Sequence, residues 1–85
     1  MSWRIELTGP ARRDLRRLDR GVAARILDAL TRLAESEIGD VKRLTGAGPL
    51  WRLRVGAWRV LYIYRYESRT LVVRRILPRD QAYRA

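Results

Sequence analysis

The fold of this chain is decided by the stretch Trp51-Arg52-Leu53-Arg54-Val55-Gly56-Ala57-Trp58-Arg59-Val60-Leu61-Tyr62. Apolar and basic residues alternate on both sides of Gly56-Ala57, and a period of two is typical of a strand with two unlike faces. A connection of only two residues predicts an antiparallel hairpin in which Val55 pairs with Trp58. The same register places Arg54 opposite Arg59.

The two faces of this hairpin have opposite chemistry. One face collects apolar residues, and the other collects Arg52, Arg54, Arg59 and Leu61. The apolar face needs a cover, whereas the arginine face is expected to stay open to water. Guanidinium groups on adjacent strands repel one another, so this arrangement favours an anion-binding site over a structural role. The alternative is an accumulation of surface arginines without a function.

The residues before the hairpin predict one strand and two helices. Trp3–Leu7 alternates as a strand does. Thr8-Gly9-Pro10 can begin a helix, because threonine is a good N-cap and proline fits the first turn. After a break at Asp19-Arg20-Gly21, a wide apolar stripe predicts a second helix from Val22 to near Ser36. Both helices have apolar faces that could cover the sheet.

The remaining segments complete an α+β fold. Residues Glu37 to Leu50 contain glycine and proline and predict a loop, with a short turn around Val41–Leu44. Strands at Leu50–Val55, Trp58–Tyr66 and Thr70–Leu77 have short connections and form an antiparallel meander. The predicted order is βααβββ, a two-layer arrangement in which the two N-terminal helices cover one face of the sheet. A length of 85 residues suits a single domain, 1–85.

Composition excludes several classes of function. The chain has no histidine and no cysteine, which removes the common zinc sites and the nucleophiles that depend on imidazole or thiolate. We therefore expect no metal site. No apolar run is long enough to span a bilayer, and the first residues enter structure without a signal-peptide core, so we expect a cytoplasmic protein with no membrane contact.

The chain is strongly basic, and its charge is uneven. Nineteen Lys and Arg face nine Asp and Glu, for a net charge of +10, which favours a polyanionic partner. Residues 42–85 hold eleven cations against only Glu67 and Asp80. The arginines of the two predicted helices stand among acids and suit a solvated helix face, with a secondary chance of phosphate contact. The strand arginines are the better candidates for binding.

The chain resembles the RelE/ParE toxins of type II toxin–antitoxin modules over nearly all of its length. The hairpin stretch is similar to the family pattern Tyr-Arg-Leu-Arg-Val-Gly-Asp-Tyr-Arg-Val-Ile-Tyr. The helical Ala11–Asp19, the approach Lys42–Gly46 and the closing Arg79-Asp80-Gln81-Ala82-Tyr83-Arg84 also resemble the family. The family's C-terminal motif usually opens with His-Arg, and Pro78 replaces that histidine here.

The resemblance implies a toxin that cleaves mRNA in the decoding site of the ribosome, and a small acidic antitoxin that binds and silences it. It assigns cleavage to Arg54, Arg59, Arg79 and Tyr83, and RNA binding to Arg52, Arg54, Lys42 and Arg43. ParE relatives share the fold and inhibit DNA gyrase instead, so gyrase inhibition is the alternative. Retention of both Arg79 and Tyr83 favours the RelE-like ribonuclease.

A ribonuclease of this kind needs no cofactor, because the 2′-OH next to the scissile phosphate is the nucleophile. Arginine stays protonated and cannot easily act as a base, so Tyr83 is the best candidate for the general base. Arg79 is the donor or stabiliser that the family suggests for the leaving oxygen. Arg79 and Tyr83 are four residues apart, which fits one side of a helical turn, although a frayed tail with a packing tyrosine explains the spacing equally well.

Overall fold

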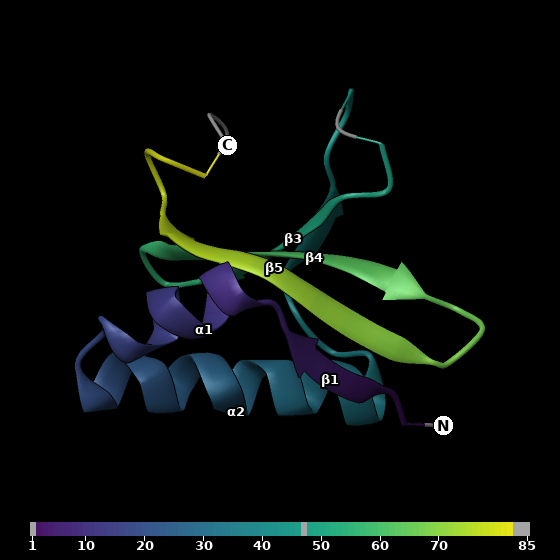
Figure 1. Cartoon of the computed structure of the whole chain (residues 1–85), viewed down its shortest axis with the longest axis horizontal. Helices are drawn as coiled ribbons and strands as arrows, with labels where there is room; N and C mark the ends of the chain where they lie inside the picture. Colours follow the sequence, from purple (N-terminus) through teal and green to yellow (C-terminus); the bar gives the residue numbers. More distant parts are fainter. Residues whose placement is uncertain (1, 47, 83–85) are drawn as a thin grey trace.

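The computed structural model describes residues 2–46 and 48–82 as two layers, with helices on one face of a sheet (Figure 1). The two helices are α1 (Gly9–Arg16) and α2 (Arg20–Ser36). The strands are β1 (Arg4–Leu7), β2 (Val41–Arg43), β3 (Trp51–Val55), β4 (Trp58–Arg65) and β5 (Thr70–Pro78). The predicted α+β class and the helical cover of one face are confirmed.

The sheet is mixed, with strand order β1-β5-β4-β3-β2. Strands β3, β4 and β5 form the predicted antiparallel meander, and β1 runs parallel to β5 at its outer side. Val55 pairs with Trp58 and Arg54 with Arg59, as the two-residue turn requires. The register predicted from the hairpin stretch is therefore confirmed.

Strand β2 lies where the sequence predicts a loop, and this part of the prediction is wrong. Val41 pairs with Leu53, and Lys42 pairs with Arg52. Three residues are too few to show a period, and β2 forms because the edge of β3 offers free backbone partners. The loop prediction holds for the segment that follows, where Gly46 and Gly48 adopt positive φ angles of 78° and 63°.

Capping residues set where the helices begin. The Thr8 hydroxyl accepts a hydrogen bond from Ala11 N–H at 3.2 Å, and the Asp19 carboxylate accepts one from Val22 N–H at 2.9 Å. Each satisfies a backbone donor that the first turn of a helix leaves free. The helices then bury Ala11, Ile26, Leu30, Leu33 and Ala34 against Leu53, Val60, Tyr62, Leu71, Val73 and Ile76 of the sheet.

A buried carboxylate joins α1 to β5 at an irregularity of the sheet. The register between β4 and β5 shifts at Leu61/Tyr62, so that Arg75 pairs with Leu61 while Val73 pairs with Tyr62. The Asp14 carboxylate, only 8% exposed, accepts hydrogen bonds from Ile76 N–H at 2.9 Å and from Arg75 Nε at 2.8 Å. Burial raises the pKa of Asp14, but these donors outweigh it and lower the pKa below its usual value.

The face of the sheet opposite the helices carries a second, smaller apolar cluster. Leu61, Leu77 and Ala82 are buried there, and Leu44 and Leu50 pack against them. Two segments rise from this face in Figure 1, one after β2 and the other at the C-terminal end. The arginine face is thus partly covered, which corrects the expectation that it is open to water. No helix within the described residues is long and apolar enough to cross a membrane.

Candidate functional site

Arg54 and Arg59 pair across β3 and β4, but they differ in accessibility. The Arg54 side chain is 57% exposed, whereas Arg59 is only 7% exposed. Arg59 Nη1 donates to the carbonyl oxygens of Gly56 and Trp58, both at 2.9 Å. The guanidinium of Arg59 therefore closes the β3–β4 turn from inside the protein. The expectation that both guanidiniums stand in water is wrong for Arg59, because the turn carbonyls and neighbouring residues enclose it.

Asp40 lies beside both arginines of β3, Arg52 and Arg54. Arg52 Nη1 donates to the Asp40 backbone oxygen at 2.9 Å and to its carboxylate at 3.1 Å, and the Arg52 side chain is 14% exposed. The same carboxylate lies 3.9 Å from Arg54 Nη1. Asp40 lies just before the acid-poor stretch of sequence, and the fold brings its carboxylate to the strand arginines as a counter-charge.

The four residues predicted to bind RNA do not share one face. Lys42 pairs with Arg52 and lies on the arginine face, while Arg43 pairs with Trp51 and points to the opposite face. Successive strand residues alternate in direction, so β2 separates these two neighbours. Lys42, Arg52 and Arg54 are brought together, and Arg43 is not.

The C-terminal segment lies beside the β3–β4 turn. Arg79 N–H donates to Ala57 O at 2.9 Å, and Ala82 N–H donates to Pro78 O at 3.1 Å, which closes a single turn of backbone. Arg79 is exposed. Exposed cations from two distant parts of the sequence, Arg54 and Arg79, therefore flank the same turn. Tyr83 lies outside the described residues.

Other described groups offer little acid–base chemistry. The arginines of α1 are exposed, as expected for a solvated helix face. Tyr62 is buried, and burial together with a hydrogen bond to Tyr64 raises its pKa far above the usual value, so it cannot serve as a base.

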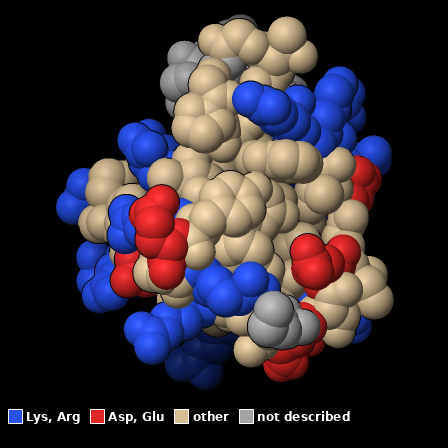
Figure 2. Space-filling view, turned by 90° about the vertical axis from the view of Figure 1, so that its right-hand side faces the viewer, with Lys and Arg blue, Asp and Glu red and all other residues tan. Residues whose placement is uncertain are grey.

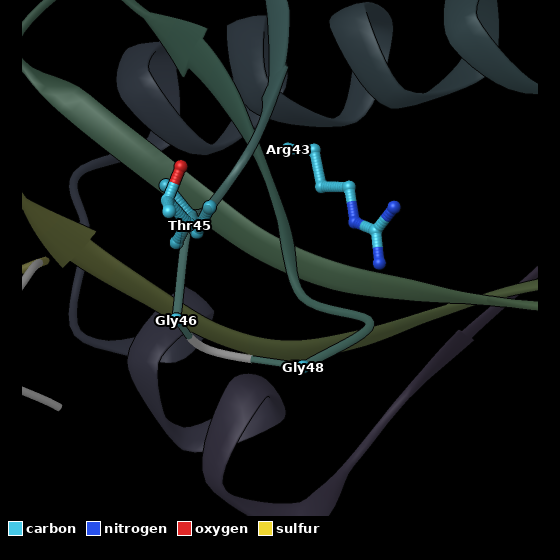
Figure 3. Close-up of a pocket in the computed structure, with 5 residues that line it drawn as sticks. Arg43, Thr45, Gly46 and Gly48 are labelled. Atoms are coloured by element: carbon cyan, nitrogen blue, oxygen red, sulfur yellow. The ribbon is translucent and has the colours of Figure 1, made fainter.

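A hollow of about 460 Å³ next to the loop after β2 is lined by Arg43, Leu44, Thr45, Gly46 and Gly48, without a carboxylate (Figure 3). Among the described residues, no group of three or more acids could hold a metal ion.

Comparison with known proteins identifies the family. The model of the ParE toxin of the type II toxin–antitoxin system parDE matches residues 5–83. The chain belongs to this toxin family. A curated relative, named as a candidate RelE1 toxin of Methanocaldococcus jannaschii, is 38% identical over 45 residues. That match covers 53% of this chain, and it spans half the length of the relative.

Solved structures of toxin family members have the same fold. A chain of the archaeal RelE–RelB complex from Pyrococcus horikoshii superposes with a TM-score of 0.78 at 25% identity, covering 96% of this chain and all of that one. The RelBE2 toxin–antitoxin complex of Mycobacterium tuberculosis gives 0.75 at 28% identity, with 93% and 100% covered. A free mutant of the E. coli RelE toxin gives 0.81 at 17% identity, with 98% and 90% covered, and shares the fold alone.

Proposed function

We propose that this toxin is a ribosome-dependent endoribonuclease that cleaves mRNA and so stops translation. The observation that carries the proposal is that two exposed arginines lie at the β3–β4 turn: Arg54 in β3 just before it, and Arg79, whose backbone N–H donates to Ala57 O from the other side of β4. Exposed arginines near one turn suit bidentate guanidinium contacts to the phosphates of a bound RNA. We expect the protein to act in the cytoplasm, where ribosomes are.

The proposed mechanism uses the RNA's own 2′-OH as nucleophile and needs no cofactor. In-line attack on the adjacent phosphorus forms a bond from the 2′-oxygen and breaks the bond to the 5′-oxygen, and negative charge grows on the phosphoryl oxygens in between. Arg54 and Arg79 stabilise that charge, an effect that mutagenesis of comparable groups values at about 3–4 kcal/mol. In this proposal ionised Tyr83 accepts the 2′-OH proton, and the 5′-oxygen leaves as an alkoxide that the Arg79 guanidinium stabilises until it takes a proton from water.

The buried arginines take supporting roles in this scheme. Arg59 holds the turn through Gly56 and Trp58 and adds positive potential beneath the site. Arg52 is held by Asp40 and, with Lys42, extends the basic surface along β3 and β2, where flanking phosphates would lie. Arg43 contacts RNA only from the other side of the sheet.

Primer extension on mRNA from programmed ribosomes tests the proposal. Purified toxin should produce cuts within translated codons, and Arg54→Ala should slow single-turnover cleavage by roughly 10²-fold. Arg25→Ala is the matched control, because Arg25 is an exposed arginine on α2 in the other layer. Cleavage that falls equally in both variants would show that only net charge matters, and wild-type toxin that leaves mRNA intact would refute the proposal.

We also propose that a small acidic antitoxin encoded beside this chain is its partner. The solved complexes of RelE with RelB pair similar toxins with antitoxins, and a net charge of +10 favours an acidic segment wrapped around the toxin. Co-purification of the two proteins, and recovery of growth when both are expressed, test this pairing.

Inhibition of DNA gyrase is the second candidate, because the matching family model is that of ParE. Arg59 is buried and Arg52 is paired with Asp40, so fewer of the strand arginines are free to bind RNA than the ribonuclease hypothesis predicts. A gyrase supercoiling assay separates the two candidates. Inhibited supercoiling with intact mRNA supports gyrase as the target, and mRNA cleavage with normal supercoiling supports the ribonuclease.

A further inference from the structure

A row of aromatic side chains lies at the end of the sheet where β4 turns into β5. We call Trp3, Trp51, Tyr64 and Tyr66 the aromatic row. Tyr64 is its centre, with ring centroids 5.0 Å from Trp3, 5.5 Å from Trp51 and 5.8 Å from Tyr66. Trp3 N–H donates to Ala34 O, which fixes the row next to the C-terminal end of α2. Tyr66 is 69% exposed, so the row reaches the surface.

A hollow of about 200 Å³ opens beside this row. Its lining consists of Trp51, Tyr64 and Tyr66 with Pro49 and a single charged residue, Arg43. Arg43 points to this side because it pairs with Trp51, away from the arginine face. Figure 2 looks onto this end of the molecule and shows an uncharged area with exposed rings, bordered by charged side chains. The hollow is therefore distinct from the site at the β3–β4 turn.

The lining indicates a small, flat ligand with negative charge nearby. At about 200 Å³ the hollow is below the range of about 300–1,000 Å³ found for drug-sized ligands, and this volume is too small for the several anchors of an amphipathic helix. Aromatic faces stack on nucleobases whatever the base, and a guanidinium at the rim can contact the adjoining phosphate. No acidic residue of the described chain lines the hollow, so nothing within it repels a phosphate.

We propose that the aromatic row and Arg43 form a second nucleic-acid site, which stacks one unpaired nucleobase of a single-stranded RNA. The base stacks on Tyr66 and Trp51, and Arg43 contacts the phosphate of the same nucleotide. The site rests on the proposed function only in its choice of RNA as ligand, since base stacking involves no cleavage. Arg43 thereby acquires an RNA contact that does not depend on the arginine face.

Nuclear magnetic resonance of the full chain tests this site with adenosine 5′-monophosphate as the probe. The backbone amides of Trp51, Tyr64 and Tyr66 should shift, while ribose 5-phosphate, which has the phosphate but no base, should leave them nearly unchanged. Equal shifts from both compounds, or shifts confined to the β3–β4 turn, would overturn the proposal. The probe is not cleaved, so a failed ribonuclease assay has no bearing on this result.

Variants at the exposed tyrosine then measure the contribution of stacking. Tyr66→Ala should weaken the binding of adenosine monophosphate and of short single-stranded RNA by roughly 5- to 150-fold, the range found when one stacking ring is removed. Tyr66→Phe keeps the ring and should bind as the native protein does. Leu27→Ala, at a residue of α2 that is 43% exposed, is the control for loss of an exposed apolar side chain. If Tyr66→Ala leaves the binding of both ligands unchanged but weakens the binding of a co-expressed antitoxin, the row is a protein interface and the proposal is wrong.

Discussion

Replacing Asp14 is expected to destabilise the toxin more than any change at an exposed ion pair. Asp14 is 8% exposed, and its carboxylate accepts three hydrogen bonds, from Arg75 Nε at 2.8 Å, Arg75 Nη2 at 3.2 Å and Ile76 N–H at 2.9 Å. These bonds connect α1 to β5 where the sheet register shifts. Asp14→Ala removes both carboxylate oxygens and with them all three hydrogen bonds, including the one from the backbone N–H of Ile76.

The magnitude follows from the burial of each partner. A buried backbone N–H that loses its acceptor costs about 1–3 kcal/mol. The Arg75 side chain is 40% exposed and can be rehydrated, so its loss adds at most about 1 kcal/mol. The free energy of unfolding should therefore fall by about 1–4 kcal/mol. For a chain of this size, each kcal/mol moves the melting temperature by about 4–8 °C.

Thermal and urea unfolding followed by circular dichroism measure the effect. Asp14→Asn keeps one acceptor for Ile76 and should lose less than Asp14→Ala. Asp28→Ala is the matched control, because Asp28 pairs with Arg32 on the surface of α2 and both are more than 60% exposed. It should change stability by no more than about 0.5 kcal/mol. If Asp14→Ala loses no more than this control, the assignment of the carboxylate as a structural lock is wrong.

The lowered pKa of Asp14 adds a pH dependence with a definite sign. A carboxyl whose pKa is lower in the folded than in the unfolded state binds its proton more readily when unfolded. Its contribution to stability is then present above the usual aspartate pKa of about 3.9 and is lost as the pH falls through the lower, folded value. The native protein should lose stability on acidification in that range, and the difference between it and Asp14→Asn should shrink.

Two further substitutions test the arginine face. Arg59→Ala should lower the free energy of unfolding by about 2–3 kcal/mol in urea melts, because it removes a buried guanidinium with hydrogen bonds to two turn carbonyls. Arg54→Ala should change it by less than about 0.5 kcal/mol, because the Arg54 side chain is largely exposed. Equal effects would contradict the difference in burial between the two arginines. Asp40→Asn removes the carboxylate 3.1 Å from Arg52 Nη1, so RNA binding should become tighter and more dependent on salt. Fluorescence anisotropy at two salt concentrations measures both effects. An unchanged affinity would mean that Asp40 does not compete with phosphate.

Local rules predicted the parts of the fold that depend on local structure. The register of β3 and β4 follows from the two-residue turn at Gly56-Ala57, and the start of α1 follows from the Thr8 cap. Helix α2 begins at Arg20, before the predicted Val22, because Asp19 caps it. Strand β2 was missed because three residues show no period and its pairing depends on β3. The aromatic row has a signal in the sequence, because Tyr62, Tyr64 and Tyr66 alternate along one strand and its continuation and so point the same way.

The site was harder to predict because burial of an arginine depends on residues far away in the sequence. The hairpin pattern placed Arg54 and Arg59 on one face correctly, but Arg59 also pairs with Leu77 of β5, whose side chain belongs to the second apolar cluster. The arginine pattern of β3 and β4 contains no information about that cover. Asp40 likewise approaches Arg52 only because β2 folds back along β3.

The arginines of this toxin differ in whether their guanidinium groups already have a hydrogen-bond acceptor within the fold. Arg59 is held by backbone carbonyls, Arg75 by the Asp14 carboxylate and Arg52 by Asp40, so each of these cations already has an acceptor within the fold. Arg54 lies 3.9 Å from its nearest carboxylate, too far for a strong hydrogen bond, and is largely exposed. An incoming phosphate can therefore bind Arg54 without breaking a native contact, whereas binding to Arg59 would cost the turn its support. This difference is why Arg54, with Arg79 beside the same turn, is the centre of the proposed site.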